Sequence, residues 1–135
     1  MRVGSEREAG RALVTVLYGY AAMPIALGAM VAIGPFGGTG RGTGMFPEPV
    51  LWLVSLMGTA VSWGMVRSPV AGPAKPQTLF HRLLIAYVCA EFPVLLAFLN
   101  VLSGGPATAY VGIAAVSVLY FLTVALPAAK NLARP

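Results

Sequence analysis

The chain has 135 residues, of which 58% are hydrophobic and only 10% are charged. A soluble domain carries roughly a quarter charged residues, so this chain has too few polar side chains to cover a surface in water. Its nine Lys and Arg against four Asp and Glu give a net charge of +5. The basic residues are scattered singly, without the aromatic-rich basic stretch of a nucleic-acid surface. One Cys and one His exclude an intramolecular disulfide, a haem pair and a zinc cluster. The composition is that of an integral membrane protein.

Four apolar stretches are each long enough, at about 1.5 Å per residue, to cross a hydrocarbon core of roughly 30 Å. They cover residues 12–33, 50–66, 79–102 and 107–129. The turn Ser103-Gly104-Gly105-Pro106 fits a tight helical hairpin between the last two stretches, whereas the Gly-rich residues 37–44 fit a flexible connector. We predict an all-α fold of four transmembrane helices in two hairpins, forming one membrane domain over residues 1–135.

The positions of Lys and Arg predict the orientation, because basic residues are retained on the cytoplasmic side of a membrane. Eight of the nine lie before the first stretch, between the second and the third or at the start of the third, or after the fourth. They are Arg2, Arg7, Arg11, Arg67, Lys75, Arg82, Lys130 and Arg134. Only Arg41 lies in the connection after the first stretch. We therefore expect both termini to be cytoplasmic.

Small residues at four-residue spacing indicate which helix packs at the centre, because helices in lipid associate through close packing rather than hydrophobic burial. The second stretch has the most, among them Gly58 and Gly64, so we expect it to be the central helix. Pro24, Pro93 and Pro127 lie inside predicted helices and each removes a backbone hydrogen bond.

Glu91 is the one carboxyl that the sequence does not place at a membrane surface. It lies about twelve residues from either end of the third stretch, where an ionised form costs from roughly 2.5 kcal/mol upward. Pro93 leaves the carbonyl of Cys89 without its usual helical donor. The Tyr87 hydroxyl, one turn away, is the polar neighbour that the same helix offers. Asn100 falls on the opposite face of that helix, and we expect it to donate a separate interhelical hydrogen bond.

Two readings of Glu91 remain open. In the first, the carboxyl binds and releases a proton, or it coordinates sodium with the Cys89 carbonyl and with hydroxyls of the second stretch. The candidate ion-binding residues are then Glu91, Cys89, Tyr87, Ser62 and Thr59, with Ser55 as a further hydroxyl. In the second, Glu91 is a structural carboxyl that donates one hydrogen bond to another helix or contacts a partner subunit.

The segment Ala90-Glu91-Phe92-Pro93-Val94-Leu95-Leu96-Ala97-Phe98 resembles the carboxylate-bearing helix of the rotor-ring c subunits of F-type and V-type ATPases. The resemblance covers this one helix and implies that Glu91 is a proton or sodium site. As a whole the chain resembles small four-span bacterial membrane proteins, which implies a multi-pass protein of the bacterial inner membrane.

These features predict a small membrane subunit that handles a proton or sodium ion at Glu91 inside a larger complex. The alternative is a purely structural subunit that stabilises a respiratory, transport or secretion complex. We expect partners in the bilayer, either other membrane subunits or further copies of the chain. We expect no catalytic activity of its own, no nucleic acid, no soluble small-molecule substrate and no cofactor other than H⁺ or Na⁺.

Reporter fusions test the predicted orientation. Fusions within residues 67–78 and after Lys130 should report the cytoplasm, and a fusion within residues 37–44 should report the opposite side, because eight basic residues favour that topology. A cytoplasmic signal from residues 37–44 would overturn the orientation.

Overall fold

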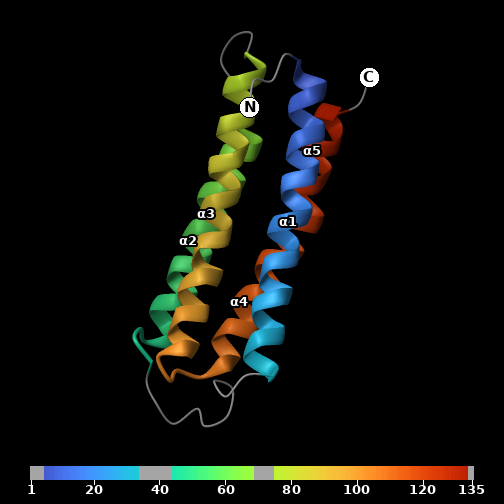
Figure 1. Ribbon diagram of the computed structural model, residues 1–135. Coiled ribbons are helices and arrows are strands. Elements are labelled where there is room, and N and C mark those ends of the chain that lie inside the picture. Colours follow the sequence, from blue (N-terminus) through green and yellow to red (C-terminus); the bar gives the residue numbers. More distant parts are fainter. Residues whose placement is uncertain (1–4, 34–43, 69–74, 134–135) are drawn as a thin grey trace.

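The computed structural model describes residues 5–33, 44–68 and 75–133, and the described chain is helical apart from short connections (Figure 1). The elements are α1 (Glu6–Ile33), α2 (Glu48–Arg67), α3 (Pro76–Leu102), α4 (Ala107–Tyr120), a π-helical turn η2 (Phe121–Ala125) and α5 (Leu126–Ala133). No strand occurs among the described residues, so the predicted all-α class is confirmed. Most of the predicted connector at 37–44 lies outside the described residues, as do Arg2, Arg41 and Arg134.

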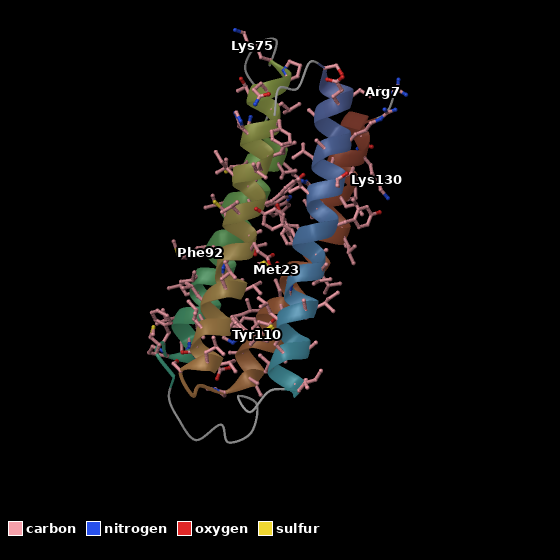
Figure 2. All side chains as sticks on the ribbon, viewed as in Figure 1. Arg7, Met23, Lys75, Phe92, Tyr110 and Lys130 are labelled. Atoms are coloured by element: carbon pink, nitrogen blue, oxygen red, sulfur yellow. The ribbon has the colours of Figure 1, made fainter. Side chains whose placement is uncertain are left out.

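Four helical segments are long and apolar enough to cross a membrane, as predicted: Arg7–Ile33, Glu48–Arg67, Pro76–Leu102 and Ala107–Asn131. The last runs through α4, η2 and α5 without a break. Successive segments run in alternating directions, so the beginning of α1, the end of α2, the beginning of α3 and the end of α5 lie at one end of the bundle (Figure 1). Arg7, Lys75 and Lys130 lie toward that same end (Figure 2).

Proline and glycine mark where the helices begin and end. Pro47 and Lys75 cap α2 and α3 in extended conformation, and each helix has a proline in its first turn, where the missing N–H is not needed. At the end of α3, Gly104 has a φ of 96°, a left-handed conformation that glycine adopts without strain. The N–H groups of Gly104 and Gly105 donate to the carbonyls of Val101 and Asn100. This is a Schellman motif, and it fixes the turn into α4.

The central helix is α3, so the expectation that the second stretch is central is wrong. α3 packs against α1, α2 and α4. In the most apolar 18-residue stretch of each helix, 50% of the α3 residues are buried, against 17% of the α2 residues. The small residues of α2 occur around much of its circumference, and spacing alone does not distinguish a packed glycine from one that faces outward.

Gly58 and Gly64 show that difference within one helix. A Cβ added at Gly58 would lie 2.5 Å from the Cys89 carbonyl oxygen and 3.1 Å from Pro93 Cγ, whereas one added at Gly64 would meet nothing within 4 Å. Gly58 therefore allows α2 to approach the backbone of α3 at the point where Pro93 has removed a helical hydrogen bond.

The core consists of two apolar clusters, one toward each end of the bundle. The first joins α1, α3 and the η2–α5 region through residues that include Leu13, Leu17, Leu83, Tyr87 and Phe121. The second contains Val31, Leu51, Val94, Ala97, Val101, Ala109, Tyr110 and Ile113. Along α3, the first cluster extends to Ala90 and the second begins at Val94. Glu91 falls between them.

The outer surface of the bundle is apolar. Large hydrophobic side chains that are exposed include Tyr18, Ile25, Leu53, Leu56, Met57, Ile85, Phe92, Leu99, Val111, Leu119 and Leu122. A monomer in water rarely exposes a continuous apolar surface of this extent, whereas lipid chains solvate it without cost. The burial pattern agrees with a multi-pass membrane protein.

The two glycines of α2 provide a matched test of the packing. We expect Gly58→Ala to lower the free energy of unfolding in detergent by about 1–3 kcal/mol, because the methyl group overpacks the α2–α3 contact. Gly64→Ala should be neutral or should stabilise α2 by up to about 1 kcal/mol, because alanine is the better helix former in open space. Equal effects of the two substitutions would mean that α2 and α3 are not in close contact at Gly58.

Candidate functional site

Glu91 lies inside the bundle, with 2% of its surface exposed. Its Oε2 accepts a hydrogen bond of 3.3 Å from the Ser117 hydroxyl of α4. Its Oε1 is buried without a hydrogen-bond partner, and it is the one buried side-chain nitrogen or oxygen in the described part of the chain of which this is true. Buried polar atoms nearly always have a partner, so this oxygen distinguishes Glu91 from every other buried polar group described.

No cation balances this carboxyl within residues 5–33, 44–68 and 75–133, since no described Lys, Arg or His side chain forms an ion pair with it. A carboxylate between two apolar clusters, with a single hydrogen bond, would be costly to keep ionised. The site as it stands therefore suits a carboxyl that carries a proton.

The spacing of residues along α4 places Ser117 at this site. Tyr110, Ile113, Ser117 and Tyr120 are all buried, and their spacing of three, four and three residues puts them on one face of a helix. That face is directed into the bundle. Ser117 is not among the site residues predicted from the sequence, although this spacing, with a lone serine between apolar residues, is the signal that could have identified it.

Four other buried hydroxyl groups are engaged in three interhelical hydrogen bonds. Ser62 Oγ and Tyr120 Oη lie 2.6 Å apart and join α2 to α4. The Tyr87 hydroxyl donates to the Ala125 carbonyl of η2 at 3.5 Å. The Tyr110 hydroxyl donates to the Pro24 carbonyl of α1 at 2.6 Å. Each of these side chains satisfies its polar atom across a helix interface, as a bundle in hydrocarbon requires.

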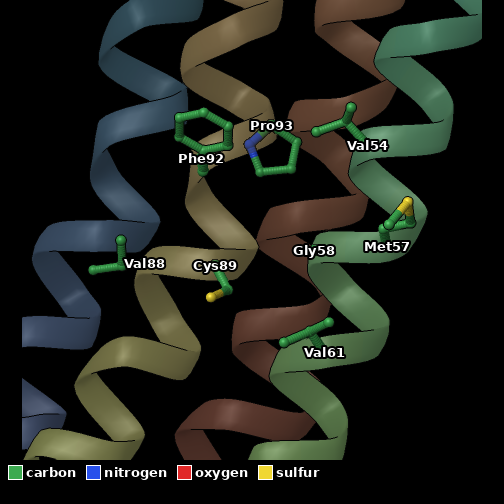
Figure 3. A pocket seen from close by; sticks show the side chains of 8 residues that line it. All are labelled: Val54, Met57, Gly58, Val61, Val88, Cys89, Phe92 and Pro93. Carbon is green, nitrogen blue, oxygen red and sulfur yellow. The ribbon is translucent and has the colours of Figure 1, made fainter.

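Cys89 presents its main chain and its side chain to α2. The carbonyl that Pro93 frees is the atom that a Cβ at Gly58 would approach, so it faces α2 at that point, while the Glu91 carboxyl contacts α4. The half-buried Cys89 side chain lines a groove of about 330 Å³ between α2 and α3 (Figure 3). The other lining residues are Val54, Met57, Gly58, Val61, Val88, Phe92 and Pro93. This lining provides no charged group, so the groove is not the chemical site.

The predicted ion-binding residues are thus distributed over several contacts. No hydrogen bond described for residues 5–33, 44–68 and 75–133 joins Glu91 to Tyr87, Ser62 or Thr59. Ser62 and Tyr87 have the partners given above, and Thr59 is half-buried on α2. The described part of the chain also contains no group of three His, Cys, Asp or Glu side chains that could hold a metal ion.

A π-helical turn lies one to two turns beyond Ser117 on the same helical segment. The Leu126 N–H donates to the Phe121 carbonyl five residues earlier, and Pro127, which follows, has no N–H to continue the usual ladder. π-turns inside α-helices occur frequently at functional sites. Here the turn carries Ala125, whose carbonyl receives the Tyr87 hydroxyl.

Asn100 lies in the last turn of α3. It was expected to donate an interhelical hydrogen bond, but its buried Oδ1 accepts one of 2.7 Å from the Phe46 N–H. Ser103 Oγ likewise accepts from the Met45 N–H at 2.8 Å. These contacts fasten the segment before α2 to the end of α3, which is a structural role.

Comparison with protein-family models, with curated proteins and with solved structures finds no match to this chain. Conclusions about its chemistry therefore depend on its own residues.

A double-mutant cycle tests the contact between α3 and α4. We expect Ser117→Ala to lower the free energy of unfolding by about 0.5–1.5 kcal/mol in wild type, and by clearly less in the Glu91→Leu background, because the hydroxyl then has no carboxyl to bind. Thr123→Ala is the control, because the exposed Thr123 hydroxyl donates to the Leu119 carbonyl of its own helix. A coupling energy no larger for Ser117 than for Thr123 would contradict the hydrogen bond.

Proposed function

We propose that the chain is a small multi-span membrane subunit in which Glu91 binds and releases a proton within a larger complex. The observation that carries this proposal is the buried Oε1 atom of Glu91, which has no hydrogen-bond partner among the described residues. A carboxyl with a purely structural role gains by pairing both of its oxygens. A carboxyl at the centre of a span with one oxygen unpaired has an oxygen free to bind a proton, a water molecule or an ion.

Burial of Glu91 weakens the reading in which it contacts a partner subunit. With 2% of its surface exposed, the side chain is enclosed by its own helices and offers a neighbouring protein nothing to bind without movement of the bundle. The carboxyl is therefore more consistent with a role inside this chain. A structural donor within the bundle remains the alternative function, and the variants below separate the two.

The proton is favoured over sodium as the ion. A carbonyl or hydroxyl set around a sodium ion would require several oxygens to converge on Glu91, but the Ser62 and Tyr87 hydroxyls are engaged with Tyr120 and Ala125. One hydroxyl, from Ser117, reaches the carboxyl. A single hydroxyl beside a carboxyl is sufficient for proton exchange.

The orientation that fits this function has both termini and the 67–75 connection in the cytoplasm, with the four spans arranged as two hairpins. The Tyr87 and Tyr120 hydroxyls lie in the cluster on the α3 N-terminal side of Glu91, and the Ser62 hydroxyl is bonded to Tyr120 there. On the other side, the buried Asn100 is engaged with the Phe46 N–H. In this orientation the carboxyl would exchange its proton with the cytoplasm.

Infrared difference spectroscopy of the purified protein provides a direct test. Between acidic and alkaline buffer, a carboxyl C=O band that shifts in D₂O should appear and disappear in wild type and should be absent from Glu91→Gln. Addition of sodium at constant pH should leave the band unchanged if the proton is the ligand, and should remove it if sodium binds. A band that persists unchanged over the whole range would show that Glu91 never releases its proton, and the structural alternative would then hold.

Replacement of the gene by variants tests the role in the cell. Gln keeps a neutral hydrogen-bonding group of nearly the same shape, so a structural carboxyl tolerates it, whereas a proton carrier requires a titratable group. We expect Glu91→Gln to assemble with wild-type thermal stability but to abolish the activity of the host complex. Glu91→Asp should retain part of that activity. Full function of the Gln variant together with impairment of the Asp variant would exclude proton handling.

A further inference from the structure

A second polar site lies at the end of the bundle where α1 and α3 begin and where α2 and α5 end. It is a pocket of about 300 Å³ between three helices, and its lining contains one charged side chain, Arg82. The remaining residues are Met65, Val66 and Ser68 from the end of α2, Leu79 and Leu83 from α3, and Ala128 and Asn131 from α5. None of them is acidic.

Arg82 has an uncompensated charge. One of its guanidinium N–H groups donates to the main-chain carbonyl of Ser68 at 3.1 Å, and no carboxylate partner is described for it within residues 5–33, 44–68 and 75–133. The Ser68 hydroxyl is already directed to the Gly64 carbonyl. A carbonyl satisfies one of the five N–H donors of an arginine but does not neutralise its charge, so donors remain for an anion in the pocket.

The level of the pocket in the bundle identifies the kind of anion. It lies at the ends of the apolar spans, one turn from Trp63, and the Arg67 guanidinium lies 4.9 Å from the centre of the Trp63 ring. Tryptophan is enriched at the level of the lipid headgroups, and arginine anchors the ends of membrane helices there. The pocket is therefore placed where lipid phosphates are concentrated.

The walls of the pocket distinguish a lipid from a free anion. Leu79, Leu83, Met65 and Val66 provide an apolar surface beside the guanidinium. Inorganic phosphate would leave that surface unfilled, whereas a phospholipid presents a phosphate together with a glycerol unit and the first carbons of its chains. Basic pockets between transmembrane helices bind anionic headgroups in this manner.

We propose that this pocket binds the headgroup of an anionic phospholipid, with Arg82 holding the phosphate between α2, α3 and α5. The proposal does not depend on any role for Glu91. Such a lipid would connect the end of α2, next to its C-cap Ser68, with the beginning of α3 and the end of α5.

Native mass spectrometry of the full chain in detergent tests the proposal, with phosphatidylglycerol and phosphatidylcholine as competing lipids. We expect wild type to retain phosphatidylglycerol at least about fivefold better, and Arg82→Gln to lose most of that preference. Arg82→Lys should keep a larger part of it, since it preserves the charge. Arg7→Gln is the control, because it removes one exposed charge at the same end of the bundle but outside the pocket (Figure 2).

Two further arms separate the alternatives. Ala128→Phe should also reduce binding while Arg82 is intact, because the ring fills the pocket, and it decides the question if Arg82→Gln fails to fold. Excess glycerol phosphate should not displace the lipid. The proposal is wrong if Arg82→Gln or Ala128→Phe binds phosphatidylglycerol as wild type does, if Arg7→Gln loses the preference to the same extent, or if glycerol phosphate competes.

Discussion

Hydrocarbon offers no hydrogen bonds, and this constraint organises the interior of the bundle. Each buried polar side chain must find its partner on another helix or on its own backbone. The structure satisfies this requirement by cross-helix contacts that connect all four spans, such as Tyr110 with Pro24, Ser62 with Tyr120 and Tyr87 with Ala125. Against that background, the free Oε1 atom of Glu91 is an exception that requires a cause.

The sequence was sufficient to predict the four membrane helices, because the length of an apolar run is a property of the chain alone. It was also sufficient to locate Glu91 at mid-span and to predict that Pro93 frees the Cys89 carbonyl. It was not sufficient to predict which side chains of different helices contact one another. Whether a small or polar residue faces a neighbouring helix or lipid depends on how the helices rotate against one another, and Gly58 and Gly64 are equivalent in the sequence but not in the fold.

The same limit explains the error about the central helix and the omission of Ser117. In water, a helix that packs at the centre can be recognised by its apolar face, because polar residues mark the outside. In lipid, the packed face and the lipid-facing face of a helix are both apolar, so apolar residues do not show which helix is central. The buried face of α4 is marked by Tyr110, Ser117 and Tyr120, whose hydroxyls bond to the other helices.

The two apolar clusters on either side of Glu91 have a consequence for the path of water. Each cluster packs apolar side chains between Glu91 and one end of the bundle, so water reaches the carboxyl from that end only when this packing opens. Simultaneous separation of both would connect the two aqueous phases and let protons leak down their gradient. A chain that exchanges protons at Glu91 must therefore keep one layer closed whenever the other opens, so the tightness of the apolar packing, as much as the carboxyl itself, would determine whether the membrane stays energised.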